Sequence, residues 1–100
     1  MEFHYTPEAL QYMDRKRRHI IAVEVAASNH SDIDITEIYI RLVTEKFGVY
    51  LRDQKRYREI KTEAGTVLLP PYHLEYAPVI TFEVKKFLCF SFLSQKGITL

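Results

Sequence analysis

Regular alternation of apolar and polar residues predicts two strands in the C-terminal part of the chain. Between positions 79 and 85 the apolar residues alternate with polar ones, and the same alternation continues at Leu88, Phe90 and Phe92. Successive side chains of a strand point to opposite faces of a sheet, so these apolar residues are expected to face a core. Phe82, Phe90 and Phe92 are therefore predicted core residues.

Two longer strands are predicted in the first half of the chain. The segment from His19 to Ala27 is apolar on both faces, which is typical of a central strand, and a polar loop is predicted at 28–32. The next strand is predicted from Ile33 to about Val43. Its apolar residues change phase midway, so a bulge or bend is expected near Thr36-Glu37.

A helix is predicted from Pro7 to about Arg17. Thr6 is a favourable N-cap residue, Pro7 suits the first helical position, and Glu8 complements the positive end of the helix dipole. Four consecutive cations at 15–18 lie where the negative end of that dipole is expected.

The remaining segments carry shorter signals. We predict an extended segment at 3–5, a turn at 44–48, a short strand at 49–51, a loop or one helical turn at 53–61, a strand at 66–69 and a turn at 72–76. Pro70 and Pro71 are expected to end the strand before them, because proline has no N–H to donate.

These elements predict an α+β fold with one N-terminal helix and a mainly antiparallel, multi-stranded sheet system. One hundred residues, 47% of them hydrophobic, are enough for one core, so residues 1–100 are predicted to form a single domain. Formal net charge is only +1, so net charge alone indicates no class of partner.

The number of cysteines and the length of the longest apolar stretch indicate where in the cell the protein is expected. The only cysteine is Cys89, which excludes a disulfide framework within the chain and favours a reading as a free thiol packed in a strand. The longest strongly apolar stretch, 87–93, is far shorter than the roughly 20 residues that span a bilayer. No targeting segment is recognised, and a cytoplasmic protein without membrane contact is predicted.

Several segments also match a known family in order and spacing. They are Phe3-His4-Tyr5-Thr6-Pro7-Glu8-Ala9-Leu10, Val23-Glu24-Val25 with the following Ser28-Asn29-His30-Ser31, Gly65-Thr66-Val67-Leu68-Leu69-Pro70, Leu74-Glu75-Tyr76, Ile80-Thr81-Phe82 and Phe90-Ser91-Phe92. In this arrangement the chain resembles the HesB-like, A-type iron–sulfur assembly proteins. The resemblance implies a HesB-like fold over most of the chain.

The same resemblance implies that the family's usual activity is absent. Its chemistry rests on three cysteines, one in the loop after the second strand and two in a Cys-Gly-Cys near the C-terminus. Here the first position falls on His30, followed by Ser31, and the paired cysteines have no counterpart. Thiolates are the ligands that iron–sulfur clusters need, so no cluster and no other cofactor is expected.

Catalytic and metal-binding motifs are not recognised. The four histidines are His4, His19, His30 and His73, and they form no helical pair with metal-ligand spacing. No metal site is predicted, although zinc held by His30, His73 and a carboxylate stays open as an alternative. Nucleophile elbows and phosphate loops are absent too, so the chain is expected not to be an enzyme.

Two clusters of cations form a second, separate candidate surface. One spans 15–18 and the other spans 52–61, where Tyr57 is interleaved. An anion- or nucleic-acid-binding module would use the residues Arg17, Arg18, Arg52, Lys55, Arg56 and Arg58. Asp14, Asp53 and Glu59 dilute both clusters, and a helix C-terminus and a solvated loop explain the same charges.

The leading hypothesis is a small binding or adaptor protein whose partner is another protein or a second copy of the chain. Tyrosines in irregular segments suit interfaces, because each combines a large apolar area with a polar tip. The predicted binding residues are His30, Tyr72, His73 and Tyr76. Anion or nucleic-acid binding is the second hypothesis, and an unrecognised enzyme or metal site is the third.

Overall fold

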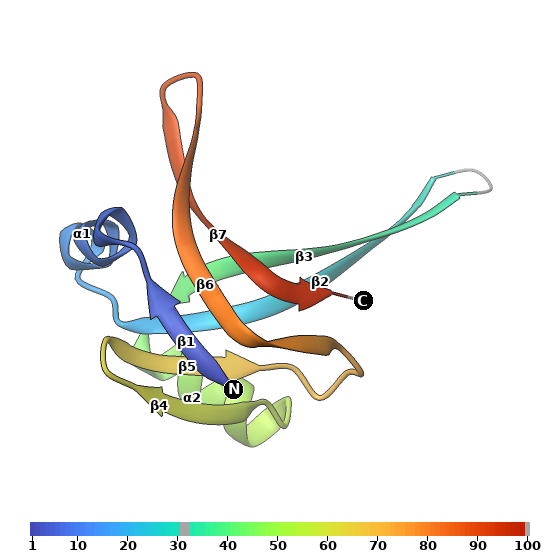
Figure 1. The fold of residues 1–100 in the computed structure, drawn as a ribbon. Coiled ribbons are helices and arrows are strands. Elements are labelled where there is room, and N and C mark those ends of the chain that lie inside the picture. The colour runs from blue at the N-terminus through green and yellow to red at the C-terminus, as the bar shows by residue number, and fades with distance from the viewer. Residues whose placement is uncertain (31–32, 100) are drawn as a thin grey trace.

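The computed structural model describes the backbone of residues 1–30 and 33–99 and the side chains of residues 1–25 and 37–99. Within these ranges the chain forms two helices and seven strands (Figure 1). Their bounds are β1 Glu2–Tyr5, α1 Pro7–Lys16, β2 Ile20–His30, β3 Ile33–Val43, α2 Glu45–Gln54, β4 Arg58–Thr62, β5 Gly65–Leu69, β6 Glu75–Phe87 and β7 Phe90–Thr99. The α+β class is confirmed, whereas the expectation of a single helix is wrong.

The strands form two mixed sheets. One has the order β1-β6-β7 and the other has the order β3-β2-β5-β4. Each described sheet contains one parallel pairing, β1 with β6 and β2 with β5, and its other pairings are antiparallel. The two parallel pairings join segments that are far apart along the sequence, so they tie the N-terminal half of the chain to the C-terminal half.

Helix α1 forms where the sequence predicts it. The Thr6 hydroxyl accepts a hydrogen bond from the Ala9 N–H at 3.1 Å, and Pro7 occupies the first turn. The helix ends at Arg17, whose φ of 54° is left-handed and stops further helical hydrogen bonding. Ala9 and Met13, four residues apart, are both buried and fix this helix to the core.

Helix α2 replaces the turn and short strand predicted at 44–51, and β4 replaces part of the loop predicted at 53–61. The Thr44 hydroxyl caps α2 by accepting a hydrogen bond from the Phe47 N–H at 3.2 Å. Gly48 and Leu51 face the sheet, and a Cβ on Gly48 would lie 3.4 Å from the Ile20 side chain. The missing side chain at position 48 therefore lets the helix lie close to β2.

Strands β2 and β3 pair in continuous register from Ile20–Val43 to His30–Ile33. Of the bulge or bend expected near Thr36-Glu37, the bulge is therefore wrong, because both residues keep their partners in β2. Part of the loop predicted at 28–32 is also wrong, since β2 continues through His30; Ser31 and Asp32 lie outside the described residues. The far end of this strand pair extends away from the rest of the fold (Figure 1).

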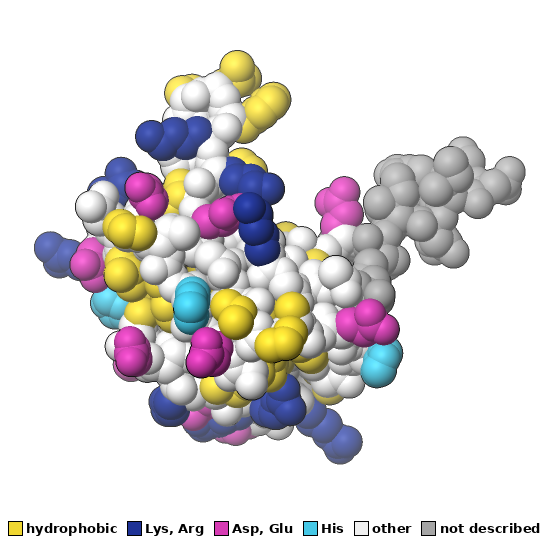
Figure 2. All heavy atoms as spheres, viewed as in Figure 1, with side chains coloured by type: hydrophobic (Ala, Val, Ile, Leu, Met, Phe, Trp, Pro, Cys, Tyr) yellow, Lys and Arg dark blue, Asp and Glu magenta, His cyan; other side chains and the backbone are white. Residues whose placement is uncertain are grey.

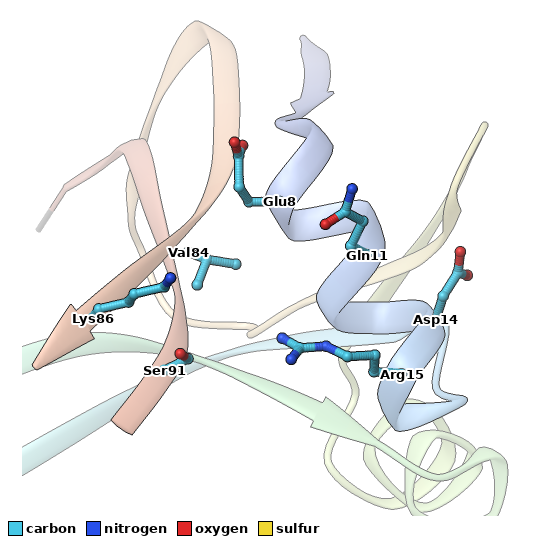
Figure 3. A pocket seen from close by; sticks show the side chains of 7 residues that line it. All are labelled: Glu8, Gln11, Asp14, Arg15, Val84, Lys86 and Ser91. Carbon is cyan, nitrogen blue, oxygen red and sulfur yellow. The ribbon is translucent and has the colours of Figure 1, made fainter. Parts of the chain in front are cut away.

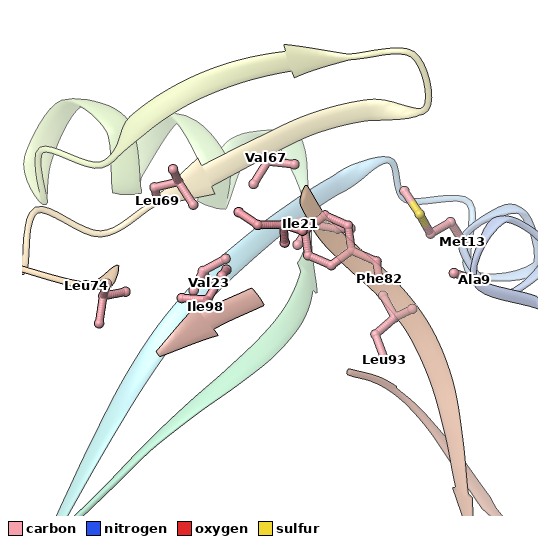
Figure 4. Close-up of a cluster of buried hydrophobic side chains, with 11 residues drawn as sticks. Ala9, Met13, Ile21, Val23, Val67, Leu69, Leu74, Phe82, Leu93 and Ile98 are labelled. Carbon is pink, nitrogen blue, oxygen red and sulfur yellow. The ribbon is translucent and has the colours of Figure 1, made fainter. Parts of the chain in front are cut away.

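The main core lies between the two sheets, with α1 at one side (Figure 4). Its fully buried members include Ile21 and Val67 from one sheet and Ile80 and Phe82 from the other. Burying side chains of this size stabilises the fold by about 1.5–3 kcal/mol each. A smaller cluster on the other face of the four-stranded sheet packs under α2.

Phe82 is a core residue, as predicted. The same prediction is wrong for Phe90 and Phe92, because both side chains are exposed. Leu93 occupies the core from β7 instead. Cys89 is not packed in a strand either: it lies exposed in the turn between β6 and β7. The turn lies beyond the part of β6 that pairs with β1. Apolar and polar residues still alternate along the strands there, but no other described element buries the apolar side chains.

Candidate functional site

The end of the β6–β7 hairpin projects from the body of the fold (Figure 1). Strand β1 pairs with β6 only as far as Phe82, and the Thr6 N–H donates a hydrogen bond to the Phe82 carbonyl at 3.0 Å, where the chain turns into α1. In the described pairings, β6 from Glu83 to Phe87 has β7 as its partner. We call residues 83–94 the hairpin arm; Val84 and Leu93 at its base contact the main core, and the rest of it extends beyond them.

The arm ends in an exposed apolar surface formed by Phe87, Leu88, Cys89 and Phe90, which we call the apolar tip. The exposed fractions are 68% for Phe87, 85% for Leu88 and 67% for Phe90. Phe92, two residues behind, is 46% exposed on the same face as Phe87 and Phe90. Scattered exposed apolar residues are ordinary, whereas a contiguous group of this kind marks an interaction surface.

Leu88 occupies a backbone conformation that disfavours its own side chain. It is the first residue of a two-residue turn closed by the Phe87–Phe90 pair, and its φ is 57°. Positions of this kind favour glycine, asparagine or aspartate, because a Cβ crowds the backbone at positive φ. An exposed leucine here serves neither turn formation nor core packing, and such local conflicts are typical of functional sites.

Two lysines lie directly behind the apolar tip, on opposite faces of the arm. Lys85 pairs with Phe92 and Lys86 pairs with Ser91, and successive strand residues point to opposite faces. No Asp or Glu occurs between positions 84 and 100. Figure 2 shows hydrophobic side chains at the end of the arm with Lys or Arg side chains below them. The two lysines form a collar behind the apolar end, and Asp or Glu side chains also lie below it.

An open pocket of about 560 Å³ lies between the arm and α1 (Figure 3). Its polar lining comes from Glu8, Gln11, Asp14 and Arg15 of the helix and from Lys86 and Ser91 of the arm. The charged groups among them are exposed and of both signs. This mixture favours no class of small ligand, so the pocket is a weaker candidate than the apolar tip.

The predicted binding residues His30, Tyr72, His73 and Tyr76 are not gathered into one site by the described parts of the chain. Tyr72 and His73 are exposed in the loop between β5 and β6, whereas Tyr76 packs against the main core, and burial raises the pKa of its phenol. His30 ends β2, its side chain is outside the described residues, and the end of β2 lies apart from that loop (Figure 1).

A polar network around Glu24 was not foreseen from the sequence. Glu24 is only 8% exposed, and the Arg41 Nη1 donates a hydrogen bond to its Oε2 at 3.3 Å. Hydrogen bonding to Glu24 raises the pKa of Tyr39, and burial, followed by the charge of Glu24, raises the pKa of Tyr57 to about 12. The Arg41–Glu24 hydrogen bond ties β3 to β2, and the charge of Glu24 acts on Tyr57 in the segment after α2. The one feature of the sequence that indicates this network is the single carboxylate, Glu24, in the otherwise apolar run at 20–27.

The two basic clusters meet in part at one end of strands β4 and β5. Lys61 pairs with Thr66, and Arg52 and Lys61 line one pocket with His19. The Thr66 N–H donates to the His19 carbonyl at 2.9 Å, which puts the end of α1, with Arg17 and Arg18, near the start of β5. Arg58 pairs with Leu69 at the other end of β5, about 13 Å along the strand.

Two of these cations bind partners within the chain. Arg52 forms ion pairs with Asp53 at 3.0 Å and with Glu59 at 3.3 Å. Arg18 donates a hydrogen bond to the Leu42 carbonyl at 3.4 Å. Lys55, Arg56 and Arg58 are exposed. Of the predicted anion-binding residues, Arg52 therefore lies toward the same end of β5 as Arg17 and Arg18, whereas Arg58 lies at the other end.

Metal-ligating side chains do not gather within the described part of the chain: no group of three or more His, Cys, Asp or Glu residues is placed to hold a metal ion there. None of the helices described is both long and apolar enough to cross a membrane. Comparison with known proteins adds no assignment, because no protein-family model, curated protein or solved structure matches the chain.

Proposed function

We propose that this chain is a non-enzymatic binding or adaptor protein that has a HesB-like fold, carries no iron–sulfur cluster and contacts its partner through the apolar tip. The observation that carries the proposal is the exposure of Phe87, Leu88 and Phe90 at the end of a projecting arm. Elements of the resemblance support the fold assignment: β1 leads directly into a Thr6-capped helix, and β5 ends at Pro70.

A single chain supplies too few thiolate ligands for a cluster. One chain offers one thiolate, Cys89, and it lies in the turn of the hairpin arm, apart from the end of β2 where the resemblance places His30 (Figure 1). Clusters are held by several thiolates, with histidine replacing some of them in one class. Incubation with iron and sulfide should therefore give no more visible absorbance than the Cys89→Ser variant does. A stable chromophore on the wild-type protein would overturn this part of the proposal.

A cross-linking experiment tests the binding role, because Cys89 offers a unique attachment point at the apolar tip. A photo-activated cross-linker on Cys89 is compared with the same group on a Gln54→Cys, Cys89→Ser variant, since Gln54 lies exposed at the end of α2. In extracts of the native cells, the label on Cys89 should give adducts, with a protein or with lipid, that the label on α2 does not give.

Competition makes the cross-linking result specific to the tip. Unlabelled wild-type protein should suppress the adducts, whereas a Leu88→Asn, Phe90→Thr variant should suppress them at least about tenfold less effectively. Identical adducts from both labelling positions, or equal competition by the two proteins, would contradict a binding role for the apolar tip.

A further inference from the structure

We infer that the partner of the apolar tip is the surface of a bilayer that contains anionic lipids. This inference rests on the proposed function, because it names the partner of the same tip. Phe87, Leu88 and Phe90 would enter the boundary between headgroups and acyl chains, and Lys85 and Lys86 would remain at the level of the headgroups. The arm would then hold the protein on the membrane without spanning it.

The dimensions of the arm fit this placement. Lys86 and Lys85 precede Leu88 by two and three residues, and a strand rises about 3.3 Å per residue. The ammonium-bearing positions therefore lie roughly 7 and 10 Å behind the turn. Peripheral elements bury their apolar faces about 5–10 Å into the headgroup and acyl boundary. Immersion of the tip to that depth brings both lysines to the phosphates.

Charge selects the class of lipid. Lys85 and Lys86 point to opposite faces of the arm, and no Asp or Glu occurs between positions 84 and 100. Lys86 lines the pocket that contains Glu8 and Asp14 of α1, whereas Lys85 points to the other face. Glu83, at the base of the arm, has the Lys96 Nζ 3.8 Å from its Oε2, which balances its charge. Basic residues next to an inserted element are attracted by the negative potential of anionic lipids. A neutral bilayer would receive the apolar tip without this attraction.

The shape of the tip favours a bilayer over a protein groove. Leu88 and Cys89 form the end of the projecting arm, and the phenylalanines behind them lie on one face. Lys85 lies on that face and Lys86 on the other. A groove would contact one face and leave the other lysine unused, whereas a bilayer surrounds an inserted hairpin from all sides.

A second copy of the chain is a less suitable partner. The other exposed large apolar residues described are distributed over separate elements, among them Leu10 in α1, Val49 in α2 and Val79 in β6. Phe47 and Tyr50 of α2 line an apolar pocket of about 540 Å³, but Lys46 lines it too. Lys55 lies over the Tyr50 ring, so this pocket would repel the lysines behind the tip. The sequence-based prediction of no membrane contact relied on the absence of a spanning segment, a criterion that does not apply to a short inserted tip.

The test uses the full chain with an environment-sensitive fluorophore on Cys89. Vesicles of phosphatidylserine and phosphatidylcholine should shift its emission to shorter wavelength and raise its intensity, and pure phosphatidylcholine vesicles should bind at least about tenfold more weakly. Inorganic phosphate and glycerophosphoserine should cause no shift, which separates a bilayer from a free phosphate group. Sedimentation of unlabelled protein with the same vesicles gives an independent readout.

Variants assign the binding to the tip and its collar. Leu88→Asn, which suits positive φ, and the double variant Lys85→Gln, Lys86→Gln should each weaken sedimentation with anionic vesicles at least about tenfold. Val49→Gln, an exposed apolar residue on α2, is the matched control and should bind as the wild type does. Circular dichroism of each variant shows whether the fold is retained.

Three results would overturn the inference: no response to anionic vesicles, equal affinity for neutral vesicles, or equal weakening by Val49→Gln. If the vesicles give no response while Cys89 cross-links to a protein in a tip-dependent manner, the lipid inference fails and the proposed binding function stands. If neither experiment gives a tip-dependent signal, both fail.

Discussion

The Arg41 Nη1 lies 3.3 Å from the Oε2 of Glu24, and this pair joins β3 to β2. Arg41 also places its guanidinium carbon 4.9 Å from the centre of the Phe47 ring. One arginine therefore satisfies a buried carboxylate and packs on α2, which links the helix to the polar network beside it.

Removal of the charge of Arg41 should destabilise the protein. Arg41→Met keeps most of the packing on Phe47 but leaves the carboxylate of Glu24 without its cation, at an expected cost of about 1–2 kcal/mol in the free energy of unfolding. Urea denaturation measures the change. Arg52→Met is the matched control, since its ion pairs are exposed and should contribute under about 1 kcal/mol. Equal effects of the two variants would show that burial of Glu24 has no energetic consequence.

Substitution of Leu88 should stabilise the isolated protein. Asparagine tolerates a φ of 57° better than leucine does, and the leucine side chain has little packing to lose. Leu88→Asn is expected to raise the free energy of unfolding by about 0.5–1 kcal/mol. Leu10→Asn, at an exposed position of α1, should lower it, because asparagine disfavours a helix interior. A loss of stability in Leu88→Asn would indicate that Leu88 packs within the protein.

Tyr57 should make the protein sensitive to alkaline pH. Burial and the charge of Glu24 raise its pKa from 10.0 to about 12, so in that interval the folded state holds a proton that the unfolded state has released. The stabilising contribution is complete below about pH 10 and is lost as pH rises toward about 12.

The pH dependence of denaturation in wild type and Tyr57→Phe measures this contribution. The decline in unfolding free energy between these pH values should be shallower in the variant, because phenylalanine has no proton to lose. Tyr5→Phe is a useful comparison, since burial also raises the pKa of Tyr5. Parallel curves for wild type and Tyr57→Phe would contradict the role assigned to Tyr57.

Alanine should be poorly tolerated at Gly65. This residue begins β5 with a φ of 144°, and a Cβ there would lie 2.0 Å from the His19 carbonyl oxygen. The clash involves backbone, so Gly65→Ala is expected to cost more than about 2 kcal/mol. Gly48→Ala is the control: its nearest neighbour is a flexible side-chain end at 3.4 Å, and helix propensity favours alanine. Thermal denaturation of both variants compares them, and similar melting temperatures would contradict this account.

Local chemistry carries enough information for several elements. Thr6 and Pro7 specify the start of α1 by capping and by a fixed φ, and Pro70 ends β5 because it cannot donate into a ladder. The sequence does not predict helix α2, because the β-branched and aromatic residues Val49 and Tyr50 favour a strand, and both are exposed on the helix. Its helical state depends on packing of Leu51 and Gly48 over the sheet, a contact between distant segments.

Whether a strand face is buried, and which side chains lie close together, depends on the three-dimensional arrangement of the elements. Alternation at Phe90 and Phe92 shows which side chains share a face of a strand, but it has the same form whether a second sheet covers that face or nothing does. The hairpin arm extends beyond the strand β1 that pairs with β6, and only the tertiary structure shows this. Likewise the thiol count can be read directly from the residues, whereas the closeness of Glu24 to Arg41 and Tyr57 arises from strand pairing and from the path of the chain after α2.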